Sequence, residues 1–310
     1  MAAERIGVVG AGLMGHGIAQ VFACAGHAVA ITDSDAEALA SVPEHIAANL
    51  GALGEDPAPA EAIELAASIE AAVTGADVVF EAAYEDLELK RALFARMSRA
   101  AGPDTLLASN TSVISVTEIA AEAHDPARVV GTHWWNPPYL VPLVEVVQAE
   151  RTSGETVEQM IGLLRRTGKL PVHVRRDVPG FVGNRLQHAL WHEAMSLVEA
   201  GVCDAETVDL VVKNSFGLRM PALGPLEGAD LVGLDLALAI HEYLIPRLDR
   251  SPAPASILRE KVERGELGMK TGRGFREWTP EAARQTRERL LRHLISVTGG
   301  GRRDNEAQPA

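Results

Sequence analysis

Two side chains able to exchange a proton lie in neighbouring apolar runs of the chain. His133 falls in the run 128–134, and Glu145 lies inside the next one, at 140–147. A carboxylate within an apolar strand is costly to bury unless a positive or hydrogen-bonding group meets it. A histidine on the adjacent strand, across a Pro-Pro turn, can be that group, and it then becomes an oriented general base. A purely structural pair fits this spacing equally well.

Glycines near the N-terminus indicate a phosphate-bearing ligand. Gly10, Gly12 and Gly15 follow an apolar run and open a helix-length segment, with Leu13 and Met14 inside the pattern. The first glycine permits a tight turn, the second lets the main chain approach a pyrophosphate, and the third allows close helix–strand packing. Free N–H groups at the helix N-terminus favour negative charge. We therefore expect these five residues to bind a dinucleotide.

The acid that such a fingerprint needs ends the second apolar run. Asp33 would bind the ribose hydroxyls of the dinucleotide and repel a 2′-phosphate. No Lys or Arg lies between Arg5 and Lys90 to accept that phosphate. The sequence thus predicts NAD rather than NADP as the cofactor.

Hydroxyl and amide groups stand where a further apolar run ends. The run 105–110 leads into Ser-Asn-Thr-Ser at 109–112. Ligands bind outside the carboxyl ends of the strands in an open α/β sheet. We therefore expect this segment to face bound molecules and count Asn110 among the cofactor contacts.

An alternation of short and long segments must position these residues. Runs rich in Val, Ile and Leu alternate with helix-length segments; the runs span 5–10, 28–33, 77–83, 105–110, 128–134, 140–147 and 170–176. This alternation is typical of a doubly wound, mostly parallel sheet. We predict an α/β fold whose N-terminal Rossmann-type domain covers residues 1–179.

The rest of the chain has the spacing of helices. Apolar residues recur at helical intervals over 181–201, 205–214, 228–249 and 255–264, and Thr279-Pro280 opens a last helix that ends near residue 297. We predict an all-α C-terminal domain at 180–298, followed by a disordered polar tail at 299–310.

Composition limits the class of protein. The 310 residues are 47% hydrophobic and 23% charged, without eighteen uncharged apolar residues in a row, so we expect no membrane-spanning helix. Cys24 and Cys203 are too few for a disulfide framework or a zinc site. The strand-like start leaves no room for a signal peptide. We predict a cytoplasmic protein without a metal site.

The net charge of −13 is concentrated near the N-terminus. Residues 1–89 hold one of the 29 basic residues and fifteen of the 42 acids, which leaves 28 and 27 for the remainder. An acidic surface repels phosphate backbones, so nucleic acid is excluded as a partner.

Together these motifs resemble those of the L-3-hydroxyacyl-CoA dehydrogenases. The likeness covers about residues 4–278; it rests on the glycine turn, residues 109–112, His133-x-x-Asn136-Pro137, Glu145, Pro-Gly-Phe-Val-Gly-Asn-Arg at 179–185 and Gly-Met-Lys-Thr-Gly-Arg-Gly-Phe at 268–275. It implies NAD-dependent oxidation of a secondary alcohol to a ketone at the 3-position of an acid derivative, as in fatty acid metabolism. It also implies a homodimer joined through the helical domain.

The resemblance further implies roles for single residues. His133 takes the hydroxyl proton while hydride passes to the nicotinamide, and Glu145 orients its imidazole. Ser112 hydrogen-bonds the reacting oxygen, with assistance from Asn184. Further positions near the cofactor are Ala82, Glu85, Lys90 and Asn136. A solvated helix lysine and a helix-terminal amide are the plain alternatives for Lys90 and Asn184.

The chain departs from the acyl-CoA enzymes where lysines meet the phosphates of coenzyme A. Residues 34–89 contain thirteen acids and no Lys or Arg, and an acidic surface weakens polyphosphate binding. Trp134-Trp135 also replaces the Phe pair associated with those enzymes.

The segment around Arg219 resembles relatives that act on small free hydroxy acids or alcohols, such as L-gulonate, L-carnitine or a pyridine carboxylate. Arg219 could clamp a substrate carboxylate, or simply pair with an acid at the surface. The substrate class stays open between a CoA thioester and a small free acid.

A protein of another class is the alternative. A lens-crystallin-like or cofactor-sensing relative could keep the fold without the reaction, since fold alone does not determine function. The four expected catalytic positions nevertheless hold competent residues, which favours an enzyme.

Overall fold

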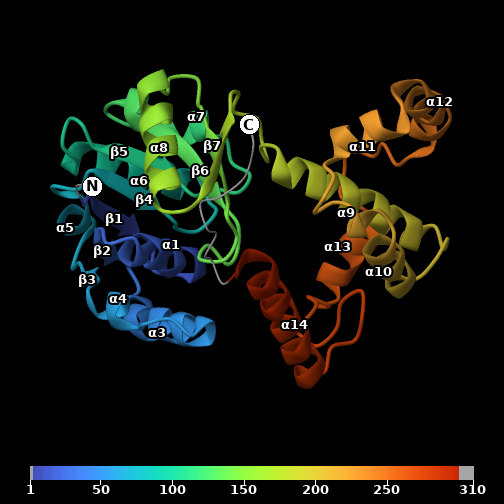
Figure 1. Cartoon of the computed structure of the whole chain (residues 1–310), viewed down its shortest axis with the longest axis horizontal. Coiled ribbons are helices and arrows are strands. Elements are labelled where there is room, and N and C mark those ends of the chain that lie inside the picture. Colours follow the sequence, from blue (N-terminus) through green and yellow to red (C-terminus); the bar gives the residue numbers. More distant parts are fainter. Residues whose placement is uncertain (1–2, 300–310) are drawn as a thin grey trace. The chain divides into compact units, whose positions relative to one another are not determined.

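The computed structural model describes residues 3–299. It divides into two compact units: the chain up to Asn184 together with the segment from Leu290, and Arg185–Arg289. Strands occur in the blue-to-green part of the chain and helices alone in the yellow-to-red part (Figure 1). The domain limits expected above stay predictions. The expected tail, apart from Gly299, lies outside the described residues.

The first unit is built on an eight-stranded sheet. Its order is β3-β2-β1-β4-β5-β6-β7-β8. The strands are β1 (Arg5–Val9), β2 (Ala28–Thr32), β3 (Glu64–Leu65), β4 (Val78–Glu81), β5 (Leu106–Ser109), β6 (Val129–Trp134), β7 (Leu143–Val147) and β8 (Leu170–Val174). All neighbours pair in parallel except β6 and β7. The predicted doubly wound, mostly parallel sheet is confirmed, although the two-residue β3 was not predicted.

Helices cover both faces of this sheet. One face packs against α1 (Leu13–Cys24), α3 (Val42–Leu53) and α8 (Gly154–Arg166), and the other against α5 (Ile69–Val73), α6 (Leu87–Ala100) and α7 (Val116–Ile119). The short α2 (Ala36–Ala40) and α4 (Ala58–Glu61) precede β3. Because both faces are covered, the strands are apolar on both sides, which explains the near-continuous apolar runs of the sequence.

Polar side chains cap the N-termini of several of these helices. The carboxylate of Asp86 accepts a hydrogen bond from the Leu89 N–H at the start of α6, and Ser153 does the same for Thr156 at the start of α8. Helix α1 differs, because Gly12 at its N-cap offers no side chain. The first turn of α1 thus keeps its N–H groups for another partner.

The second unit consists of helices. They are α9 (Gly183–Glu199, whose first two residues belong to the first unit), α10 (Ala205–Asn214), α11 (Pro225–Val232), α12 (Leu234–Leu244), α13 (Ser256–Glu263) and the start of α14 (Pro280–Thr298). The prediction of one helix over 228–249 is wrong. Gly233, at φ +98°, separates α11 from α12, since a left-handed residue ends a helix and favours glycine. Within residues 3–299, no helix is long and apolar enough to cross a membrane.

Hydrophobic side chains of the second unit are largely uncovered. Between residues 185 and 289, the buried apolar residues are Ala255 and Ala283. Large side chains on α11 and α12 are exposed, among them Leu226 at 80% and Leu231 at 74%. Helices α11 and α12 therefore leave many large apolar side chains in contact with solvent.

Candidate active site

His133 and Glu145 form a buried pair on adjacent strands. The antiparallel register of β6 and β7 places them opposite each other, and Nδ1 of His133 lies 2.6 Å from Oε2 of Glu145. Their exposed fractions are 3% and 1%. The predicted pairing across the Pro-Pro turn is therefore present. Nε2 of His133 makes no hydrogen bond within the described residues, so it can accept a proton from a ligand.

The second oxygen of Glu145 is held by the turn that leads into α9. Its Oε1 accepts hydrogen bonds from the N–H groups of Val182 at 2.9 Å and Gly183 at 3.1 Å. Burial alone raises the pKa of Glu145, but the hydrogen bonds from His133, Gly183 and Val182 outweigh it, and the pKa is lowered. Glu145 is thus held as a carboxylate that stabilises positive charge on the imidazole.

The turn before α9 adopts an unfavourable backbone conformation. Phe181, which is 1% exposed, has φ +50°, a region that bulky residues rarely occupy. Gly180 before it has φ +77°. This arrangement aims two consecutive N–H groups at Glu145 and brings the Phe181 ring to 5.7 Å from the His133 ring. Local strain of this kind often accompanies a functional site.

Ser112 and Asn184 meet beside this turn. Nδ2 of Asn184 donates to the Ser112 carbonyl at 2.8 Å, and the Ser112 N–H donates to Glu85 Oε1 at 2.8 Å. Glu85 Oε1 also accepts from Thr111 and Val113. Burial opposes ionisation of Glu85, but these donors and the charge of Lys90 lower its pKa. Ser112 is therefore fixed by its main chain, while its side chain is left exposed.

The glycine turn has the shape that a pyrophosphate needs. A Cβ at Gly10 would lie 2.6 Å from the Ala82 carbonyl oxygen, and one at Gly15 would lie 1.8 Å from the Gly10 oxygen. A Cβ at Gly12 would meet open space, in front of the helix end that no side chain caps. Asp33 lies beside the turn, and its Oδ2 accepts the Ala11 N–H at 2.6 Å. These residues fit a dinucleotide.

Comparison with known proteins agrees with this geometry. Residues 5–178 match the family described as "3-hydroxyacyl-CoA dehydrogenase, NAD binding domain", and residues 180–278 match its C-terminal domain. The chain belongs to the 3-hydroxyacyl-CoA dehydrogenase family. It is an NAD-dependent dehydrogenase, so the predicted fold class, cofactor and type of reaction are confirmed.

Relatives of this dehydrogenase carry different names. A 5-formyl-3-hydroxy-2-methylpyridine 4-carboxylate 5-dehydrogenase of Mesorhizobium japonicum is 35% identical over 95% of this chain and 97% of its own. A probable 3-hydroxybutyryl-CoA dehydrogenase of Bacillus subtilis is 39% identical over 90% and 98%. A solved structure of a 5-formyl-3-hydroxy-2-methylpyridine 4-carboxylic acid 5-dehydrogenase superposes with a TM-score of 0.90, at 33% identity and over 98% and 100% of the two chains.

Lys90 of the dehydrogenase is fully buried and not a solvated helix lysine. Its Nζ lies 2.7 Å from Oε1 of Glu81, which is also 0% exposed, and 3.6 Å from Oε2 of Glu85. Ser109 donates to the other oxygen of Glu81 at 2.7 Å. Glu81 was not predicted as a site residue, although an acid within the apolar run 77–83 is the same signal that indicated Glu145. Contact of Lys90 with the cofactor stays a prediction.

The remaining expected cofactor contacts lie at the same edge of the sheet. The Ala82 carbonyl abuts Gly10, and Asn110 accepts the Trp134 N–H at 3.1 Å. Asn136 is exposed in the loop after β6.

Arg219 lies in the second unit, exposed and without an ion pair to any acid among residues 3–299. Within that range no group of three or more His, Cys, Asp or Glu side chains could hold a metal ion.

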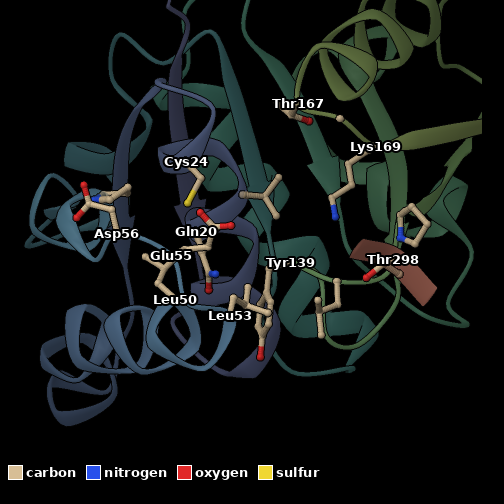
Figure 2. A pocket seen from close by; sticks show the side chains of 15 residues that line it. Gln20, Cys24, Leu50, Leu53, Glu55, Asp56, Tyr139, Thr167, Lys169 and Thr298 are labelled. Carbon is tan, nitrogen blue, oxygen red and sulfur yellow. The ribbon is translucent and has the colours of Figure 1, made fainter. Parts of the chain in front are cut away.

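A cavity of about 380 Å³ lies elsewhere in the first unit. Figure 2 shows Lys169 projecting towards it from one side and Tyr139 standing near Leu53 on another. The Lys169 ammonium donates to the carbonyls of Pro138 and Val141, and burial lowers its pKa to about 8. None of the expected site residues lines this cavity, so it is separate from the His133 centre.

Proposed function

We propose that this dehydrogenase oxidises a secondary hydroxyl of a small free hydroxy acid, with His133 as general base. The buried His133–Glu145 pair carries the proposal, because Nδ1 is occupied by the carboxylate while Nε2 stays available. Nε2 takes the proton of the substrate hydroxyl. NAD, when bound, would supply the acceptor for the hydride of the carbinol carbon, so that a ketone is left.

Residues around His133 support this step. Glu145 stabilises the imidazolium that forms, since it is held as a carboxylate by two further N–H groups. Ser112 donates its hydroxyl to the reacting oxygen, and Asn184 fixes the Ser112 main chain through its carbonyl. The hydrogen bond between Asn184 and the Ser112 carbonyl supports both roles.

The proposed cofactor contacts lie at the same edge of the sheet. The pyrophosphate would be held by Gly10, Gly12, Leu13, Met14 and Gly15, and the ribose hydroxyls by Asp33. The nicotinamide half of NAD would be held by Ala82, Glu85, Lys90, Asn110 and Asn136. Lys90 acts there through Glu81 and Glu85, since no part of it is exposed.

The acidic surface of the first unit favours a free acid over a CoA thioester. Eleven of the thirteen acids between residues 34 and 89 are exposed; the exceptions are Glu55 and Glu81. Exposed acids repel the phosphates of coenzyme A. The Mesorhizobium relative is named for a pyridine carboxylate and the Bacillus relative for a CoA ester, so both substrate classes are compatible with this family. Arg219, unpaired within the described chain, would bind the substrate carboxylate.

A second copy of this chain is the proposed partner, and the cytoplasm the proposed compartment. The apolar side chains of α11 and α12 need a cover that residues 3–299 do not provide, and association of like subunits buries such surfaces. Light scattering should therefore give the mass of a dimer. Replacement of Leu238, which is 61% exposed, by Asp should shift that mass towards the monomer.

Two substrates measured side by side test the proposed reaction. NADH formation from L-3-hydroxybutyrate and from L-3-hydroxybutyryl-CoA is followed with the purified full chain. We expect kcat/KM to favour the free acid at least about tenfold, which corresponds to about 1.4 kcal/mol. Preference for the thioester would overturn the substrate class while leaving the dehydrogenase chemistry intact.

A further inference from the structure

Trp135 lies beside His133, the proposed general base, and projects from the same side of the chain. Side chains alternate along a strand, so His133 and Trp135 project to one side at the end of β6 and Trp134 to the other. The ring of Trp135 lies 4.9 Å from that of His133, centroid to centroid. Trp134, 2% exposed, instead packs in the core against Phe22 and Phe80. The two tryptophans of the doublet therefore occupy different environments.

The main chain of α9 holds the Trp135 ring in place. A Cβ on Gly183 would lie 2.4 Å from Cζ2 of the indole and 3.4 Å from Oε2 of Glu145. Any side chain at this position would displace the ring. The Gly183 N–H also donates to Glu145. One glycine thus fixes both the partner of the base and the aromatic ring next to the base.

Core packing and hydrogen bonding do not explain a tryptophan at this position. Trp135 is only partly buried, and its Nε1 is buried without an acceptor among the described residues. A buried indole N–H usually finds a partner. What Trp135 contributes is a wide aromatic surface next to His133.

We propose that Trp135 is a substrate-binding residue that selects planar acids. Its indole stacks on a flat ring or conjugated carboxylate of the substrate, which holds the carbinol against Nε2 of His133. This inference rests on the proposed oxidation of a small hydroxy acid and narrows the class of acid. Offset stacking requires ring centroids about 4.5–7 Å apart, and a puckered saturated ring lacks the π face that makes it favourable.

Two acids of equal charge and similar size, one with a planar ring and one with a puckered ring, test whether the site prefers planar ligands. Pyridine-4-carboxylate and cyclohexanecarboxylate are titrated calorimetrically into the full chain saturated with NADH. Neither has a hydroxyl group to oxidise, so binding is measured without turnover. We expect the planar acid to bind about five- to tenfold more tightly. Trp135→Leu should bring the ratio of the two dissociation constants close to one, and Trp135→Phe should give an intermediate ratio.

Trp134→Phe is the matched control, because its ring lies on the other side of the same strand end and should leave the ratio unchanged. A ratio near one in the unmodified protein, or an unchanged ratio in Trp135→Leu, would overturn the inference. If circular dichroism shows that Trp135→Leu does not fold, the Trp135→Phe ratio decides instead. Since the probes do not react, failure of the proposed oxidation appears separately, as absence of NADH formation from hydroxy acids.

Discussion

Glu81 and Glu145 are both buried carboxylates, but they pair with different side chains, Lys90 and His133. They lie on strands β4 and β7 of one sheet, with exposed fractions of 0% and 1%. Each carboxylate accepts three hydrogen bonds; the donors are Lys90, Ser109 and the Ala83 N–H for Glu81, and His133, Val182 and Gly183 for Glu145. Burial and hydrogen bonding therefore do not distinguish the acid that we propose for catalysis from the one paired with Lys90.

The partner cation makes the difference. Lys90 is fully enclosed and directs its ammonium at carboxylates and a carbonyl. His133 uses one nitrogen for Glu145 and keeps the other free, and an imidazole nitrogen can both accept and donate a proton. Under the proposed mechanism, a buried acid takes part in catalysis only where its partner can pass a proton on. The following substitutions test this distinction.

Replacement of His133 should have the largest effect on the reaction. His133→Gln keeps a hydrogen-bonding side chain near Glu145 but has no basic nitrogen, so we expect kcat to fall at least about a thousandfold. Affinity for NADH, measured by fluorescence titration, should stay unchanged because the glycine turn is untouched. Turnover close to that of the unmodified enzyme would remove His133 from the role of base.

Replacement of Lys90 should affect stability first. Lys90→Met leaves the Glu81 carboxylate buried without its cation, which costs about 3–5 kcal/mol. Urea unfolding measures this loss. The double variant Glu81→Gln/Lys90→Met removes the charge but keeps an acceptor for Ser109, so we expect it to regain most of the stability. A double variant as unstable as Lys90→Met would show that the ion pair is not the cause.

Much of the first unit was predictable because its strands are covered on both faces. Apolar runs identified seven of the eight strands, and the spacing of Gly10, Gly12 and Gly15 located the turn before α1. Strand β3 escaped prediction because Glu64 and Leu65, both exposed, carry no apolar pattern. The break between α11 and α12 was also missed, since apolar residues continue through Gly233 while its left-handed φ is not visible in a periodic pattern.

Several features of the site depend on tertiary structure alone. The run 77–83 contains Glu81, but only the fold shows that Lys90 turns inward to meet it. The backbone strain at Phe181 and the close approach of Gly183 to Trp135 likewise arise from how the turn before α9 packs on β6 and β7. The pairing of His133 with Glu145, in contrast, could be predicted from the sequence, because the length of the intervening turn sets the register of the two strands.

Replacement of Glu145 should have the smallest of the three effects and should depend on pH. Glu145→Gln keeps the size of the side chain, but it replaces one acceptor oxygen by an NH2 group and loses the charge that would stabilise the imidazolium, so we expect kcat to fall about a hundredfold, less than for His133→Gln. The pKa of Glu145 lies below its ordinary value of 4.5 in the folded protein. Its charge therefore stabilises the fold above that value, and this contribution is lost as the pH falls through the folded-state pKa. Unfolding free energies of both proteins should differ at pH 7 and converge in acid; a difference that persists in acid would mean that packing, and not the carboxylate charge, makes Glu145 important.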